Sequence, residues 1–289
     1  MTDTLSTAGG RTVLRMQRRL AHPQATVWRA ITEPDHLAHW FPFTMELDLQ
    51  PDGKITFLDQ DGTPSGYGVV TELEPPRVFA FSWGDDLLRW ELRPDGDGCL
   101  LTLHHTFDDR AGAASFAAGW HTCIEALDAT LDGRTATLPR TMAEFAQLHE
   151  DRIALFGLDR GTIEETPNGW QIRFERQLTQ PVDAVWTMLA GPTTPAPGEP
   201  PPPGFTTDPV PAGPTTACEP PRLLEYETPA ADGRQAPGHI RWDLRNGTGD
   251  GARLVLIHAG SGGPEAERDT ALAAWHDHIE RLATRAATA

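Results

Sequence analysis

The histidines are the residues of this sequence whose type and position best fit a catalytic or ligand-binding role. His105 shares one face of a predicted strand with Leu101 and Leu103, and this face should point inward. An inward imidazole could donate a hydrogen bond to a ligand oxygen, or act as a general acid or base near neutral pH. Alternatively it is a core histidine satisfied by its neighbours, and its recurrence as His258 favours this second interpretation.

Other chemical motifs are weaker. His36 and His39 lie one helical turn apart, but no carboxylate or third histidine follows at ligand spacing, so we expect no metal site. The stretch GTGDG at 247–251 aligns with an earlier PDGDG and predicts a hairpin turn. The stretch 260–263 could bind an anion at a helix N-terminus, but it lacks the lysine of a phosphate-binding loop and predicts a flexible connection instead. Because the sequence contains no GxSxG or HExxH motif, we assign no catalytic residue, no metal and no cofactor.

The composition of the chain limits the kinds of partner it can bind and indicates the cellular compartment. The 289 residues carry 24 Lys and Arg against 41 Asp and Glu, and the net charge of -17 opposes binding to nucleic acid. Three widely spaced cysteines predict reduced thiols and no disulfide. No stretch has the apolar run of a signal peptide or of a membrane span, so we expect a cytoplasmic protein.

The chain repeats itself, and the repeat predicts its organisation. Five segments of the first half return in the same order in the second half, and the second copy is shorter between the first two of them. The matched pairs are 14–28 with 172–186, EPPR at 74–77 with 219–222, 89–93 with 241–245, 98–105 with 251–258, and 119–127 with 274–282.

The spacing of the repeat predicts two domains and a linker. We expect a first domain over residues 1–135, a helical linker over 136–168 and a shortened second domain over 169–289. Residues 191–216 form a proline-rich insertion where the first copy has strand patterns, and a proline run cannot donate to a sheet ladder. We therefore expect a disordered connection there, with a PxxP ligand for a partner domain as the alternative.

The first copy has the order strand, two short helices, several strands and one long helix. Val13 to Leu20 predicts a strand and Pro23 to Ile31 a helix, after which a second short helix follows. Alternating apolar residues joined by PDG and DG turns then predict an antiparallel meander. Residues 111–132 place large apolar side chains at helical spacing. Since one long helix must cover the apolar face of this sheet, the fold class is α+β.

This order, with PDHLAHWF after the first helix, EPPR before a strand, then RWELR and a GW pair in the last helix, resembles the SRPBCC superfamily of START and birch-allergen-like proteins. Within it, the chain looks like the branch of heat-shock-ATPase-activator homologues, over most of residues 13–133 and more weakly over 172–282. The resemblance implies two tandem helix-grip domains, each a curved antiparallel sheet around a long C-terminal helix. It also implies a cavity that accepts apolar molecules in many relatives, but no particular reaction.

The cavity of the first domain is the candidate ligand site. Strand alternation, the WFPF segment and the spacing of the long helix predict its lining. The predicted lining residues are Trp40, Phe41, Phe43, Phe79, Phe81, Trp83, Trp90, Leu92, Leu103, His105, Phe116 and Trp120. We expect noncatalytic binding of an apolar or aromatic small molecule there. A cyclase or hydrolase using His105 is one alternative, and a chaperone-linked or partner-binding module is another. We expect the second domain to have little or no cavity.

Overall fold

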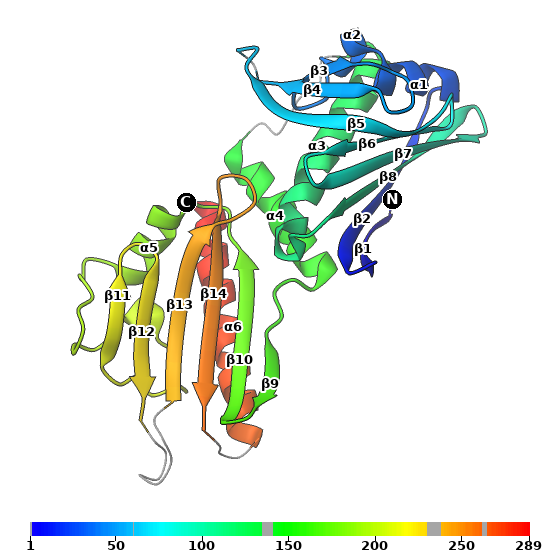
Figure 1. Cartoon of the computed structure of the whole chain (residues 1–289). Coiled ribbons are helices and arrows are strands. Elements are labelled where there is room, and N and C mark those ends of the chain that lie inside the picture. The colour runs from blue at the N-terminus through cyan, green and yellow to red at the C-terminus, as the bar shows by residue number, and fades with distance from the viewer. Residues whose placement is uncertain (1, 60, 135–140, 230–237, 262–264) are drawn as a thin grey trace. The chain divides into compact units, whose positions relative to one another are not determined.

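The computed structural model describes the whole chain except residues 1, 60, 135–140, 230–237 and 262–264 (Figure 1). The chain divides into two compact units, Met1–Met142 and Ala143–Ala289. Each unit has its own antiparallel sheet and its own long helix. The predicted α+β class is therefore confirmed.

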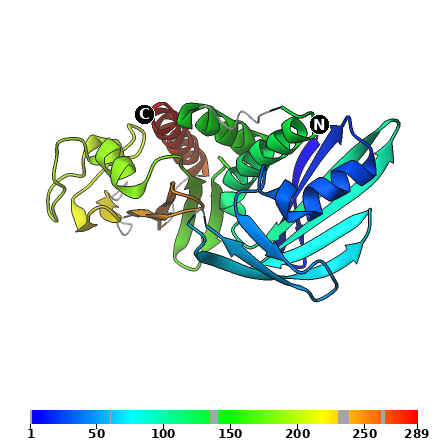
Figure 2. The ribbon, with the colours of Figure 1, turned by 90° about the horizontal axis from the view of Figure 1, so that it is seen from above.

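The first unit is a curved sheet that holds a long helix. Among its described residues the strands are β1 (Thr2–Ala8), β2 (Arg11–Leu20), β3 (Thr44–Leu47), β4 (Lys54–Leu58), β5 (Pro64–Glu74), β6 (Val78–Trp83), β7 (Asp86–Asp95) and β8 (Gly98–Phe107). They form one antiparallel sheet in the order β1-β2-β8-β7-β6-β5-β4-β3. The helices are α1 (Gln24–Thr32), α2 (Pro34–Leu37), the 3-10 turn η1 (Arg110–Gly112) and the long α3 (Ala113–Leu131). Seen from above, the strands curve around α1 and α3, which is the predicted helix-grip arrangement (Figure 2).

Alternating burial explains why these segments form strands. In β2, Leu14, Met16, Arg18 and Leu20 are buried and the residues that alternate with them are more exposed, as expected for a sheet with one covered face. In β8 the same side of the sheet carries the buried Leu101 and Leu103. Buried alanines in the first two turns of α3 allow the helix to approach this face closely.

Strand β1 was not predicted from the sequence. Its segment TDTLSTA contains one large apolar residue, Leu5, so it shows no hydrophobic alternation. Gly9 and Gly10, with φ of 58° and 81°, make the tight turn that folds β1 back onto β2. The buried Arg18 donates to Asp3, with 2.6 Å between Nη1 and Oδ1. This ion pair ties the polar strand to the edge of the sheet.

The second unit repeats this topology with fewer strands. Among its described residues the strands are β9 (Thr162–Thr166), β10 (Gly169–Gln177), β11 (Thr215–Glu219), β12 (Leu223–Thr228), β13 (Gly238–Asn246) and β14 (Ala252–Gly260). Their order, β11-β12-β13-β14-β10-β9, corresponds to β5-β6-β7-β8-β2-β1, and the described residues hold no counterpart of β3 or β4. Helix α5 (Val182–Ala190) corresponds to α1, and α6 (Glu265–Thr288) to α3. The matched sequence segments therefore mark two copies of one fold.

Most of the segment expected to be a linker is built into the second unit. This applies to β9, which pairs with β10, and to all but the first residue of α4 (Met142–Phe156). Glu150 of α4 forms an ion pair with Arg176 of β10, which is 1% exposed. Arg176 also binds Glu280 of α6, with 2.9 Å between Nε and Oε1. The helix, the sheet and α6 thus meet at one buried guanidinium.

The proline-rich segment is a packed loop, so the expectation of disorder was wrong. It turns at η2 (Pro203–Phe205), and the Phe205 side chain is fully buried. The carbonyl oxygen of Phe205 accepts hydrogen bonds from Tyr226 Oη at 2.7 Å and from Trp242 Nε1 at 3.1 Å. Phe205 therefore anchors the loop twice: its side chain packs in the core, and its carbonyl oxygen is hydrogen-bonded to two core residues. Composition alone does not reveal this.

Candidate functional site

Aromatic side chains of the first unit form a continuous cluster between the sheet and α3. Phe41, which follows α2, has its ring centroid 5.6 Å from Trp40 and 5.9 Å from Trp120. Trp90 of β7 lies 5.6 Å from Trp40 and 5.5 Å from Trp120, nearly perpendicular to both rings. Edge-to-face contacts at such distances are favourable beyond the burial of area alone. The cluster therefore joins the segment after α2 to the sheet and to α3.

The structure buries most of the residues predicted to line the cavity. Those that are buried are Trp40, Phe41, Phe79, Phe81, Trp90, Leu92, Leu103, His105 and Trp120. Phe43, Trp83 and Phe116 are partly exposed. The prediction omitted Phe57 of β4, which is fully buried in the cluster, although the alternation of Ile55 and Phe57 in KITFL is a signal that could have found it.

The cluster reaches the surface at Trp83, the last residue of β6. Phe43 packs edge-on against Trp83 at 5.0 Å, and Phe57 stacks on it at 4.6 Å between ring centroids. Gly66 of β5 leaves room for this indole, because a Cβ at that position would lie 3.1 Å from Trp83 Nε1. Trp83 therefore combines partial exposure with aromatic neighbours on two sides.

His105 has partners for both ring nitrogens. Trp120 Nε1 donates a hydrogen bond to Nδ1 at 3.2 Å, so the ring proton lies on Nε2. Nε2 in turn donates to Asp86 Oδ2 at 2.9 Å. Phe107, which the prediction also omitted, and Phe116 pack against the imidazole at 4.8 and 4.7 Å between ring centroids. His105 is 3% exposed, and both nitrogen atoms of its ring have partners within the first unit.

The second unit keeps the histidine–tryptophan pair and lacks the carboxylate. Trp275 Nε1 donates to His258 Nδ1 at 3.2 Å, the same contact as in the first unit. The strand register places Gly238 at the position of Asp86. Burial lowers the pKa of His258 to about 4. Because the pair occurs in both copies, its shared role is to join the last strand to the long helix.

Phe205 takes the place in the second unit that Trp40 has in the first. Its ring centroid lies 5.6 Å from Trp242 at an angle of 87°, and Trp40 lies 5.6 Å from Trp90 at 84°. Trp186 of α5 contacts Phe205 at 5.2 Å. The proline-rich loop thus supplies a core residue that the first copy takes from the segment after α2.

Comparison with known proteins agrees with this geometry. Residues 21–132, from just before α1 to just after α3, match the family model described as "Activator of Hsp90 ATPase homolog 1-like protein" (AHSA1). Residues 21–132 are an AHSA1 domain. This confirms the family resemblance for the first copy.

The chain that contains this AHSA1 domain is also similar to solved structures. One is CalU16 from Micromonospora echinospora, which is 25% identical over 53% of this chain and 95% of that chain, with a TM-score of 0.44. Another is the conserved protein of unknown function EF2215 from Enterococcus faecalis, which is 19% identical over 54% and 90% of the two chains, with a TM-score of 0.46. No curated protein matches the chain.

The AHSA1 domain has no thiol prepared for nucleophilic chemistry among its described residues. Cys99 and Cys123 are free, and burial raises the pKa of both thiols, to about 12 for Cys123. Across the described part of the chain, no group of three or more His, Cys, Asp or Glu side chains could hold a metal ion. None of the helices in the described ranges is long and apolar enough to cross a membrane.

We expect the stability of the second unit to fall between about pH 6.5 and pH 4. The unfolded chain protonates His258 near the ordinary pKa of 6.5, whereas the folded unit resists protonation down to about 4, so protons favour the unfolded state in this interval. The loss reaches roughly 3 kcal/mol for this one group. Urea denaturation at several pH values measures it. His258→Gln cannot gain the charge and should flatten the pH dependence; an unchanged slope contradicts the assignment.

Proposed function

We propose that the AHSA1 domain of the first unit binds an apolar or aromatic small molecule at its aromatic cluster and catalyses no reaction. The observation that carries this proposal is Trp83, a partly exposed indole stacked on the buried Phe57 and contacted edge-on by Phe43. A ligand ring that meets this end of the cluster finds aromatic surface, which suits binding driven by apolar burial. Family membership supports the proposal, because AHSA1 and other SRPBCC proteins commonly bind hydrophobic ligands.

The arrangement around His105 argues against the enzyme alternative. A general acid or base needs one ring nitrogen within reach of the substrate. In this domain Trp120 occupies Nδ1 and Asp86 occupies Nε2. A chaperone partner rests on the family description alone, so small-molecule binding remains the proposal.

We propose that the second unit is a structural copy without this site. Phe205 supplies its core, and the described residues have no counterpart of β3 and β4, the strands that bring Phe57 into the first cluster. Tyr226, which corresponds to Phe81, directs its hydroxyl group to the loop carbonyl of Phe205. The proline-rich loop thus occupies, with Phe205, the aromatic side chains that a bound molecule would have to contact in the second unit.

The full chain should bind the uncharged fluorophore N-phenyl-1-naphthylamine saturably, and Trp83→Ala should weaken this binding about tenfold or more. Removing a large indole from a ligand contact costs on the order of 1.5–3 kcal/mol. Fluorescence titration measures the affinity. Trp28→Ala is the matched control, because Trp28 is also a partly exposed tryptophan of the first unit and lies outside the cluster. Equal loss in both variants, or no saturable binding by the unmodified chain, contradicts the proposal.

A further inference from the structure

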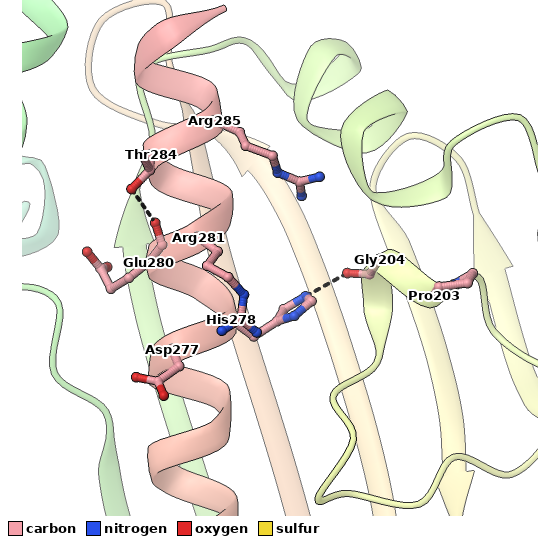
Figure 3. Close-up of a pocket in the computed structure, with 8 residues that line it drawn as sticks. All are labelled: Pro203, Gly204, Asp277, His278, Glu280, Arg281, Thr284 and Arg285. Carbon is pink, nitrogen blue, oxygen red and sulfur yellow. Dashed lines mark hydrogen bonds between the residues drawn. The ribbon is translucent and has the colours of Figure 1, made fainter.

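A groove of about 760 Å³ runs along the C-terminal half of α6 in the second unit (Figure 3). Pro203 and Gly204 of η2 form one wall, and α6 forms the other. His278 Nε2 donates a hydrogen bond to the carbonyl oxygen of Gly204 at 2.8 Å, which fixes the loop against the helix. The groove therefore has two walls held at a defined separation.

The groove lies on a part of the helix that is buried in the first copy. With Trp120 and Trp275 aligned by their histidine partners, Ala126 and Ala129 of α3 correspond to Arg281 and Thr284 of α6. The two alanines are 2% and 5% exposed, whereas Arg281 and Thr284 are exposed. The second copy has thus replaced small packed residues with polar ones where the helix faces solvent.

Two arginines lie on the loop side of the groove. Arg281 and Arg285 lie one helical turn apart and extend toward the loop (Figure 3). Asp277 and Glu280 also line the groove, but their side chains leave the helix on the side away from the loop. The described residues provide no carboxylate partner for either guanidinium, and Glu280 is held by Arg176 at 2.9 Å.

His278 is a neutral member of this site. Burial lowers its pKa, and the charges of Arg281 and Arg285 add to the lowering against the opposing hydrogen bond to Gly204. The positive charge on the loop side of the groove therefore comes from the two guanidinium groups, and the imidazole ring and Pro203 offer uncharged surface beside them.

We propose that this groove binds a small molecule that carries an oxyanion, such as a phosphate monoester or a carboxylate, on a flat apolar group. Guanidinium groups donate paired hydrogen bonds in a geometry that matches phosphate and carboxylate oxygens. Two of them on one helix face can hold one oxyanion, and the apolar group then lies against Pro203 and the His278 ring. The C-terminal end of α6 carries a partial negative charge, which repels an anion. This repulsion is weaker than the attraction of the two full positive charges on Arg281 and Arg285. This site is independent of the aromatic cluster in the first unit.

Titration of the full chain with phenyl phosphate tests the proposal. Binding is measured by the NMR signals of the His278 ring and of the arginine Nε–H groups. We expect saturable binding that Arg281→Gln and Arg285→Gln each weaken about tenfold, because each removes a charge-assisted pair of hydrogen bonds. Arg160→Gln is the control, since Arg160 is an exposed arginine of the same unit and its loss changes the net charge equally. This control should change the affinity less than twofold.

Further measurements separate binding from folding. Arg285 lies in the last turn of α6, where a positive charge also stabilises the helix, so thermal unfolding of each variant is measured without ligand. Arg281→Lys keeps the charge and should retain part of the affinity. Weaker binding by inorganic phosphate than by phenyl phosphate supports the apolar contact. Equal affinity in the groove variants and in Arg160→Gln, or no saturable shift, overturns the proposal. Trp83→Ala should leave this binding unchanged, so failure of the first site and failure of this one are distinguishable.

Discussion

Replacing Arg176 with methionine is expected to lower the free energy of unfolding of the second unit by about 3–5 kcal/mol. The guanidinium is buried and forms ion pairs with Glu150 of α4 and Glu280 of α6. Methionine preserves much of the apolar stem but leaves two partly buried carboxylates without their shared counter-charge. Urea denaturation of the full chain, followed by tryptophan fluorescence, measures the loss.

A neighbouring arginine provides the matched control for this prediction. Arg173 lies on the same strand, its side chain is 37% exposed, and it pairs with Glu175 at 2.5 Å. Exposed ion pairs contribute at most about 1 kcal/mol, so Arg173→Met should have a small effect. Adding Glu150→Gln and Glu280→Gln to Arg176→Met should recover part of the loss, because it removes the uncompensated charges. Equal losses in the two single variants would show that the buried ion pairs do not hold α4 in place.

Replacing Phe205 with alanine is expected to cost the second unit about 3–5 kcal/mol and to open an apolar cavity. The ring is fully buried between Trp186 and Trp242, at 5.2 and 5.6 Å between centroids. The backbone carbonyl that anchors the loop remains in place, so the loop should close only part of the space. A dry cavity lined by aromatic rings can take up a small apolar molecule. Benzene should therefore raise the unfolding temperature of the variant.

The control for the cavity is Leu155→Ala in α4. Leu155 is 56% exposed, so its truncation should change the free energy of unfolding by less than about 0.5 kcal/mol and create no site for benzene. The decisive comparison is the benzene-induced rise in unfolding temperature. A rise of the same size in the unmodified chain and in Phe205→Ala would mean that no new cavity has formed.

The topology of both units could be predicted because the relevant signals are local. Buried residues such as Leu101 and Leu103 recur at a spacing of two, and the repeat shows the same pattern again around Leu254 and Leu256. Strand β1 could not be found in this way. Its stability comes from a hairpin turn and from the ion pair between Arg18 and Asp3, and neither requires an apolar pattern.

The candidate sites were only partly predictable, because their geometry depends on register and on tertiary contacts. The aromatic lining of the first cluster followed from alternation, but the partner of His105 did not. Asp86 lies on the neighbouring strand, and only the paired register brings the two side chains together. Phe205 is a single aromatic residue in a proline-rich segment, so no period marks it as core. The groove beside Arg281 forms where α6 is exposed at positions that are buried in α3. The spacing of apolar residues in the sequence does not show this difference.

The strand order also determines the stage of protein synthesis at which each unit can complete its sheet. In both sheets the long strand near the start of the unit pairs with the last strand: Met16 lies opposite Leu103, and Phe174 lies opposite Leu256. Such distant pairings cost loop-closure entropy before they contribute any stability, so they form late in folding. A ribosome releases the last strand of the first unit long before that of the second. The first unit can therefore complete its sheet while the second still exposes the unpaired edge of β10, and an unpaired strand edge makes a partly folded chain prone to aggregation.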